Sequence, residues 1–152
     1  MKKLNSIVLI FLFPLLFFSC RNSNDRVQKM LFSVIPREHL AMYKYVVIIP
    51  QDGCEGCITY AEEFYTTNKN NPQIKFIFTN IISEKKLKKR LEITDSTTID
   101  KDGLLIENCE ESERLYPVVI KLDNGFVKKI TFQSPTEDGL FELDYLIEEG
   151  HV

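Results

Sequence analysis

The sequence has no excess of basic residues, and this lack argues against one class of function. Its 19 Lys and Arg residues are outnumbered by 22 Asp and Glu residues, so the net charge is -3 at pH 7. A nucleic-acid-binding domain needs a basic patch or stripe. The sequence also has no internal repeat, phosphate-binding loop, serine triad or paired carboxylates, and its two histidines, His39 and His151, have no partner at a spacing that suits acid–base catalysis. Hydrolase and kinase functions therefore find no support.

Long apolar runs are absent after residue 20, and the only one in the sequence lies near its start. Lys2 and Lys3 precede an almost unbroken apolar run from Ile7 to Phe18, which contains Pro14. Twelve residues are too few to span a bilayer, for which about 20 are needed. A short apolar run behind a basic start is typical of a secretory signal peptide.

This run ends at Ser19-Cys20 and is followed by a polar segment. A small residue before a cysteine at this point resembles the lipobox of bacterial lipoproteins. The resemblance implies that residues 1–19 are a signal peptide and that Cys20 is acylated and becomes the first residue of the mature protein. We therefore expect a lipid-anchored protein of the bacterial cell envelope, on the periplasmic side or at the outer membrane. The alternative is an uncleaved anchor in which Cys20 is an ordinary thiol.

Cysteine is scarce, and export gives each of the four residues a specific meaning. Disulfides form and persist outside the cytoplasm. With Cys20 assigned to lipid, the remaining Cys54, Cys57 and Cys109 cannot all pair within one molecule. Cys109 lies in an acidic stretch over 107–111, which lowers the expected reactivity of its thiol. We interpret Cys109 as a partly buried bystander, with a third redox partner as the alternative.

The order of expected elements indicates an α/β fold. A β-branched and aromatic run over 43–50 predicts a strand that is buried on both faces, and a helical pattern follows it. Residues 21–26 are expected to be a polar tether. In chain order we expect a short helix over 27–34, strands over 43–50 and 74–82 that alternate with helices over 55–68 and 83–92, a hairpin over 117–132 that turns at 123–125, and a helix over 137–149. This last helix is expected to direct five apolar residues to the core: Leu140, Phe141, Leu143, Tyr145 and Leu146.

The segment Cys54-Glu55-Gly56-Cys57 joins the first strand to the helix over 55–68. The start of a helix presents unsatisfied N–H groups and the positive end of the backbone dipole. Both favour a thiolate, which is the species that attacks a disulfide. The three-residue spacing places the two sulfur atoms on one helical face. We therefore expect Cys54 to attack and Cys57 to resolve the mixed disulfide.

A strand that leads into C-x-x-C and a helix, followed by X-Pro and a strand-turn-strand, resembles the thioredoxin superfamily. The X-Pro is Tyr116-Pro117, and the similarity covers roughly residues 40–149. The 59 residues between Cys57 and Pro117 are similar to the exported, membrane-tethered relatives of the TlpA/ResA type. The resemblance implies a thioredoxin-like domain over 39–152, with a central mixed sheet of about four strands flanked by helices, behind a lipidated cysteine, tether and short helix over 20–38.

The resemblance also implies an activity. In that family the proline is cis and lies beside the disulfide, where the backbone of its neighbour receives the substrate strand. We therefore expect thiol–disulfide exchange on exported proteins, with Tyr116, Pro117, Gly53 and Glu55 in the substrate groove. No cofactor or metal is implied, because the cysteines are the redox centre. The usual electron donor of the family is an integral-membrane thiol carrier.

Three positions depart from the thioredoxin pattern. Gly53 replaces an aromatic residue, Glu55-Gly56 replaces Gly-Pro between the cysteines, and Ile48 replaces a buried acid. The carboxylates of Glu55 and Asp52 place negative charge near the thiols, and negative charge disfavours a thiolate. We therefore predict a reducing or isomerising protein with a relatively low potential.

Other interpretations of these residues remain open. Cys54 and Cys57 can form an inert structural disulfide in a non-catalytic thioredoxin-fold binding module, or half of a zinc site completed by Cys109 and His39. Peroxidase-like relatives use a Pro-x-x-x-Thr-x-x-Cys motif, which the sequence lacks. The basic run over 85–90 is interpreted as a solvated helix face, with contact to anionic lipid head groups as the alternative.

Overall fold

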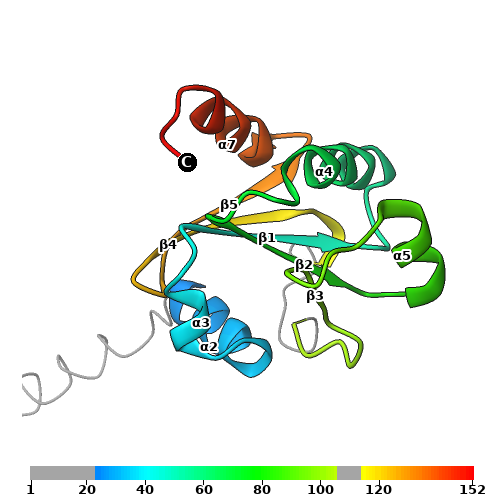
Figure 1. The fold of residues 1–152 in the computed structure, drawn as a ribbon, viewed down its shortest axis with the longest axis horizontal. Coiled ribbons are helices and arrows are strands. Elements are labelled where there is room, and N and C mark those ends of the chain that lie inside the picture. Colours follow the sequence, from blue (N-terminus) through cyan, green and yellow to red (C-terminus); the bar gives the residue numbers. More distant parts are fainter. Residues whose placement is uncertain (1–22, 106–113) are drawn as a thin grey trace, which may run out of the picture.

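The centre of the fold is a mixed sheet of six strands, seen in a computed structural model that describes residues 23–105 and 114–152 (Figure 1). The strand order is β3-β2-β1-β4-β5-β6. β1 pairs in parallel with β2 and antiparallel with β4, which places it in the middle of the sheet. The strands are β1 (Tyr45–Pro50), β2 (Ile74–Thr79), β3 (Thr98–Ile99), β4 (Val118–Asp123), β5 (Phe126–Ser134) and β6 (Glu137–Asp138).

The expected α/β class is confirmed, but the expected count of about four strands is wrong. The two additional strands are β3, which pairs with Ile77 and Phe78 of β2, and β6, which pairs with the last two residues of β5. Each additional strand has only two residues. Two residues are too few to produce the alternating pattern by which a strand is recognised in a sequence.

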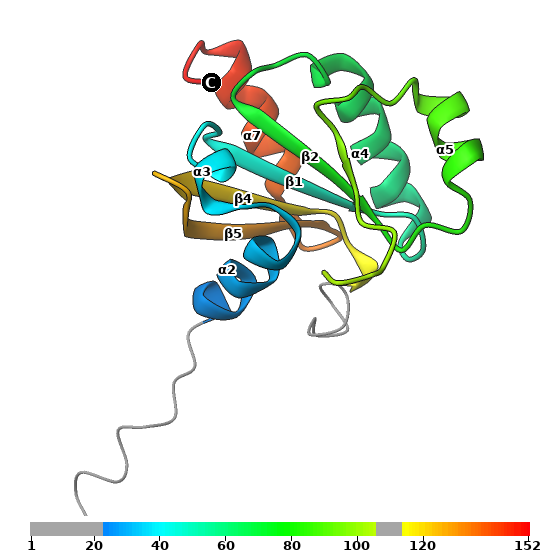
Figure 2. The same ribbon diagram turned by 60° about the horizontal axis from the view of Figure 1, so that its bottom comes forward.

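Helices cover both faces of the sheet, as Figures 1 and 2 show. On one face, α4 (Glu55–Asn68), α5 (Glu84–Leu91) and α7 (Gly139–Glu148) contribute buried residues to a cluster with Val47, Ile49, Phe76 and Phe78. On the other face, α2 (Ser23–Val34) and α3 (Arg37–Leu40) contribute to a second cluster. All six residues of β1 and all six of β2 are buried, as expected for strands covered on both faces.

Helix α2 begins at Ser23, so it includes most of the segment expected to be a polar tether. Asp25 lies in its first turn, where a carboxylate is favoured by the helix dipole. The Gln28 side chain donates a hydrogen bond to the Gly125 carbonyl (3.2 Å) and accepts one from the Val127 N–H (2.6 Å). Polar residues of this helix therefore hold it to the β4–β5 hairpin, while its apolar residues enter the core.

The hairpin turn forms where the sequence predicts it. Asn124 and Gly125 both adopt positive φ, 51° and 82°. Two consecutive residues of positive φ are the requirement of a tight hairpin turn, and Asn-Gly meets it at low conformational cost. The second strand ends three residues earlier than expected, at Thr79, because Asn80 turns the chain with φ 55°.

The expected core face of α7 is partly wrong. Leu140 and Leu143 are buried and Leu146 is partly buried, but Phe141 and Tyr145 are 64% and 57% exposed. Residues 141 and 145 lie four positions apart and share the opposite helical face from residues 140 and 143. Within the two described ranges, no helix is both long and apolar enough to cross a membrane.

If α2 belongs to the core, shortening one of its buried side chains will destabilise the whole domain. Leu31 is fully buried and packs in the cluster with β1 and β4, whereas its neighbour Phe32 is 37% exposed. We expect Leu31→Ala to lower the free energy of unfolding by about 2–5 kcal/mol, measured by urea denaturation. Phe32→Ala is the matched control and should cost clearly less. Equal and small effects of the two substitutions would show that α2 is not part of the cooperative unit.

Candidate redox site at the start of helix α4

Cys54 and Cys57 form a disulfide at the junction of β1 and α4. Their Cα atoms are 5.3 Å apart, within the usual range for a disulfide. Cys54 is the N-cap residue of α4 and Cys57 lies in its first turn. Both residues are half-buried, so the bond lies at the surface and not inside either apolar cluster.

The start of α4 presents backbone N–H groups that can donate hydrogen bonds to a sulfur atom. The Cys54 carbonyl accepts the first helical hydrogen bond, from the Ile58 N–H (2.9 Å), and the Cys54 side chain itself makes no capping hydrogen bond. The first N–H groups of an α-helix have no partner within the helix. These N–H groups and the helix dipole favour negative charge at Cys54 when the disulfide opens.

The segment before Tyr116-Pro117 lies directly against the first cysteine. The Cys54 N–H donates a hydrogen bond to the Leu115 carbonyl (3.0 Å). At Gly53, which has φ 143°, an added Cβ would lie 2.8 Å from the Leu115 Cα and closer still to its carbonyl oxygen. No side chain fits there. Gly53, which departs from the thioredoxin pattern, is therefore explained by this close approach.

The hydrogen bond between Cys54 and Leu115 brings Tyr116 and Pro117, two of the residues expected in the groove, near the disulfide. Pro117 is buried, and its carbonyl accepts a hydrogen bond from the Gln133 N–H (2.9 Å). Tyr116 is half-buried. The cis proline implied by the resemblance is not found, because every peptide bond in residues 23–105 and 114–152 is trans.

The remaining positions that depart from the thioredoxin pattern have different surroundings. Glu55 and Asp52 are exposed, so water screens their carboxylates. Ile48 is 6% exposed and packs in the apolar cluster on the α2 face. Ile48 therefore provides no carboxyl group at the position where the thioredoxin pattern has a buried acid.

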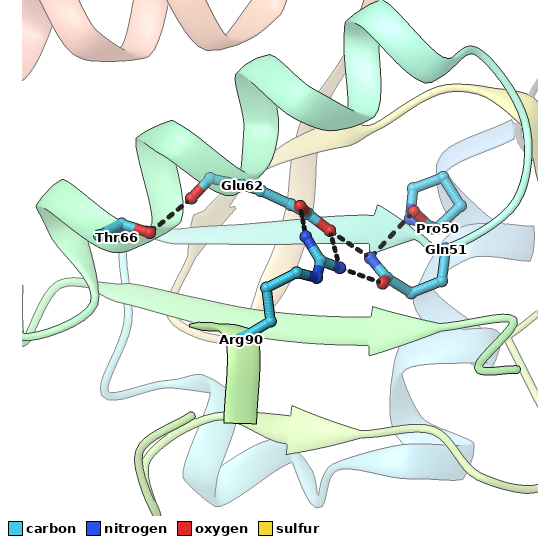
Figure 3. A network of polar contacts seen from close by, with 5 residues as sticks. All are labelled: Pro50, Gln51, Glu62, Thr66 and Arg90. Atoms are coloured by element: carbon cyan, nitrogen blue, oxygen red, sulfur yellow. Dashed lines mark hydrogen bonds and ion pairs between the residues drawn. The ribbon is translucent and has the colours of Figure 1, made fainter. Parts of the chain in front are cut away.

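A polar network holds the loop that leads from β1 to Cys54, and no pattern in the sequence predicts it (Figure 3). The Gln51 side chain donates to one carboxylate oxygen of Glu62 (3.0 Å) and accepts from the Arg90 guanidinium (3.1 Å). Arg90 also binds both carboxylate oxygens of Glu62, and these bonds raise the pKa of Arg90. The loop after β1 is thus tied to both α4 and α5.

Tyr60, one helical turn after Cys57, is a second residue that the sequence did not single out. Burial raises its pKa, and the carboxylates of Asp144, Asp138 and Glu63 raise it further. Two of these acids come from the region of α7. Acidic side chains therefore act on Tyr60, one helical turn from the disulfide. The i, i+3 spacing from Cys57 is readable in the sequence, but the approach of α7 is not.

Other residues of interest lie elsewhere. His39 is in α3, which precedes β1, whereas Cys54 follows the far end of that strand. No group of three His, Cys, Asp or Glu side chains in the described part of the chain is placed to hold a metal ion. Cys20 and Cys109 lie outside the described residues. The basic run forms the solvated face of α5, as expected, with Leu87 and Leu91 buried beneath it.

Gly53 in the loop and Gly56 in the first turn of α4 provide a matched test of the Leu115 contact. We expect Gly53→Ala to lower the free energy of unfolding by about 1–3 kcal/mol, because alanine meets both an unfavourable φ and the Leu115 backbone. Among the residues that the structure describes, no atom beyond the helix's own backbone lies within 4 Å of a Cβ added to Gly56, which is in the helix. Gly56→Ala should leave the stability unchanged or raise it by up to about 1 kcal/mol. Thermal or urea unfolding of both variants makes the comparison, and similar losses would contradict the packing described.

The Glu62–Arg90 contact is expected to stabilise the loop. Arg90→Met removes three hydrogen bonds and leaves the Glu62 carboxylate, whose side chain is only 12% exposed, without its charged partner. We expect a loss of about 1–2 kcal/mol, reduced from that of a buried pair because Arg90 is half exposed. Lys88→Met, which removes the exposed pair with Glu84, is the control and should cost about 0.5 kcal/mol or less. Equal losses would mean that the network contributes nothing specific.

No protein-family model, curated protein or solved structure matches the chain. The function is therefore argued from the geometry of this site.

Proposed function

We propose that the chain is a membrane-tethered thiol–disulfide exchange protein with a thioredoxin-like fold. The observation that carries the proposal is the Cys54–Cys57 disulfide at the start of α4, next to the Leu115–Pro117 segment. The proposed substrates are exported proteins. An integral-membrane thiol carrier is the proposed electron donor.

The strand order supports a thioredoxin-like fold. β1 leads into the disulfide and α4, β2 returns parallel to β1, and the β4–β5 hairpin pairs antiparallel with the other edge of β1 before α7. With α5 between β2 and the hairpin, the order is the expected one of strand, helix, strand, helix, hairpin and helix, and it contains the strand, C-x-x-C, helix and strand-turn-strand on which the resemblance rests. The trans bond before Pro117 is a departure from it.

The proposed reaction begins from the reduced pair. The Cys54 thiolate attacks a sulfur atom of the substrate disulfide, forms a mixed disulfide and releases the other substrate sulfur as a thiolate, which takes a proton. The Cys57 thiol then loses its proton and attacks the Cys54 sulfur. This second step releases the fully reduced substrate and leaves the Cys54–Cys57 disulfide. Two electrons pass to the substrate, and the carrier must return two electrons and two protons.

The substrate is proposed to contact the Leu115–Pro117 segment. The backbone of this segment lies beside Cys54, and Leu115 is 39% exposed. An extended peptide can pair with such a backbone while its disulfide meets Cys54. The lack of a Cβ at Gly53 keeps this segment close to the sulfur.

The acidic surroundings support the reducing or isomerising direction. A protein is a strong oxidant when its reduced form is stabilised. Asp144, Asp138 and Glu63 act on Tyr60, one helical turn from Cys57, and together with the exposed, screened carboxylates of Glu55 and Asp52 they oppose the effect of the helix start and disfavour a thiolate, and so the reduced form. The disulfide form is then relatively stable, which corresponds to a low potential.

A redox titration of the mature chain, residues 20–152, tests the proposal. Free thiols at Cys54 and Cys57 are scored by alkylation and mass, and folding is followed by circular dichroism in the same samples. We expect a reversible transition between about -180 and -270 mV, with the fold retained. Cys54→Ser should abolish the transition, while Cys109→Ser is the control and should leave it unchanged. A pair that stays oxidised far below this range, or whose reduction unfolds the domain, would indicate a structural disulfide in a non-catalytic binding module.

A further inference from the structure

The end of the sheet opposite to the disulfide brings together three segments, which we call the hairpin end: residues 23–30, 37–44 and 121–129. The hairpin turn packs against α3, since a Cβ on Gly125 would lie 3.1 Å from the Arg37 carbonyl oxygen. The start of α2 lies on the same hairpin, because the Asn24 side chain donates a hydrogen bond to the Lys128 carbonyl (3.4 Å). Figure 1 shows the blue start of α2 and this turn on one side of the molecule, and the loop after β1 on the other.

The hairpin end is basic in an acidic protein. Its three segments contain seven Lys and Arg residues and three Asp and Glu residues, whereas the whole chain has a net charge of -3. Arg37, Lys44 and Lys121 are exposed, and the Lys128 side chain is 63% exposed. The ion pairs of Lys128 with Asp123 (3.8 Å) and of Lys129 with Glu142 (3.2 Å) are solvent-accessible and leave a net positive surface.

Apolar side chains are exposed among these charges. Met42 is 65% exposed and Phe126 is 46% exposed, and the Arg37 guanidinium lies 4.1 Å from the centre of the Phe126 ring. Met42 also borders an open hollow of about 600 Å³ that Lys44 and Lys121 help to line. A surface that combines cations with scattered apolar groups fits the head-group region of an anionic bilayer.

The short distance between Cys20, the expected lipidation site, and α2 indicates that the partner of the hairpin end is the membrane. Only Arg21 and Asn22 separate Cys20 from Ser23, the first residue of α2. Three residue steps span at most about 11 Å, which is close to the distance over which charges act at physiological salt. An acyl chain on Cys20 would therefore keep the hairpin end within electrostatic reach of the lipid head groups.

We propose that the hairpin end of the tethered domain docks on an anionic membrane surface. The proposal rests on the lipidation of Cys20 within the proposed function and is independent of the exchange reaction. It has a consequence for that reaction, because the disulfide follows the opposite end of β1. Six strand residues correspond to about 20 Å, so the cysteines lie about that far along β1 from the docked end, and a membrane carrier has to reach beyond the bilayer surface to reduce them.

Lysine reactivity tests the orientation. The full-length protein, matured and acylated in a bacterial host, is reconstituted in phosphatidylcholine vesicles with or without 30% phosphatidylglycerol. It is then treated with a membrane-impermeant amine reagent and analysed by peptide mass spectrometry. We expect Lys44, Lys121 and Lys128 to react more slowly on anionic vesicles than in detergent. The exposed Lys85 and Lys86 of α5 are internal controls and should react equally in both, and the protection should decrease as salt is raised.

Two paired variants measure the contribution of charge. Lys121→Gln with Lys128→Gln should weaken docking on anionic vesicles by about fivefold for each charge removed, read from the remaining protection of Lys44. Lys85→Gln with Lys86→Gln removes the same charge from α5 and should have no effect.

Three outcomes would overturn the proposal: equal reactivity at both groups of lysines, protection of Lys85 and Lys86 instead, or an N-terminal peptide without an acyl group on Cys20. None of them affects the redox titration, so membrane docking and the exchange reaction fail separately; only the missing acyl group would also remove the membrane tether from the proposed function.

Discussion

The hydrogen bond from the Cys54 N–H to the Leu115 carbonyl is the contact on which the candidate site depends. It joins the strand–helix unit that carries the disulfide to the segment that opens the β4–β5 hairpin, although the two are 61 positions apart in the sequence. The contact requires a glycine at position 53, because any side chain there would meet the Leu115 backbone. The Gln51–Glu62–Arg90 network supports the same loop from the other side, through α4 and α5. The disulfide therefore lies on a loop that is held at both ends, although it is half-exposed itself.

The burial of β1 on both faces explains why functional groups gather at its two ends. Along the strand, every residue is covered by helices or by neighbouring strands, so no polar chemistry is available there. The end after Pro50 carries the disulfide and acidic neighbours, and the end before Tyr45 carries basic and exposed apolar residues. The proposed functions follow this division: exchange with substrates takes place at one end, and contact with the membrane at the other. In the proposed arrangement, this separation leaves the half-buried cysteines accessible from the solvent.

Local patterns in the sequence were sufficient for the elements that depend on local interactions. The helix over 55–68 was predicted with the bounds of α4, and Asn124-Gly125 identified the hairpin turn from conformational preference alone. Contacts between distant segments were not predictable in this way. The fit of Gly53 against Leu115, the Glu62–Arg90 pair and the acids of α7 around Tyr60 all depend on how elements pack. Phe141 and Tyr145 were wrongly assigned to the core because an apolar helix does not reveal which of its faces is covered.

In the proposed reaction, Cys54 forms a mixed disulfide with the substrate and Cys57 resolves it. Trapping the mixed disulfide tests this reaction most directly: Cys57→Ser in the mature chain is reduced, incubated with oxidised glutathione, quenched with acid and analysed by intact and peptide mass spectrometry. The account predicts a glutathione adduct on Cys54 that forms faster than any adduct on Cys109 and is released when a second thiol is supplied. In Cys54→Ser, it predicts little adduct on Cys57, the residue further into the helix. An adduct that forms on Cys54 no faster than on Cys109, or that forms only when the protein is unfolded, would contradict the account.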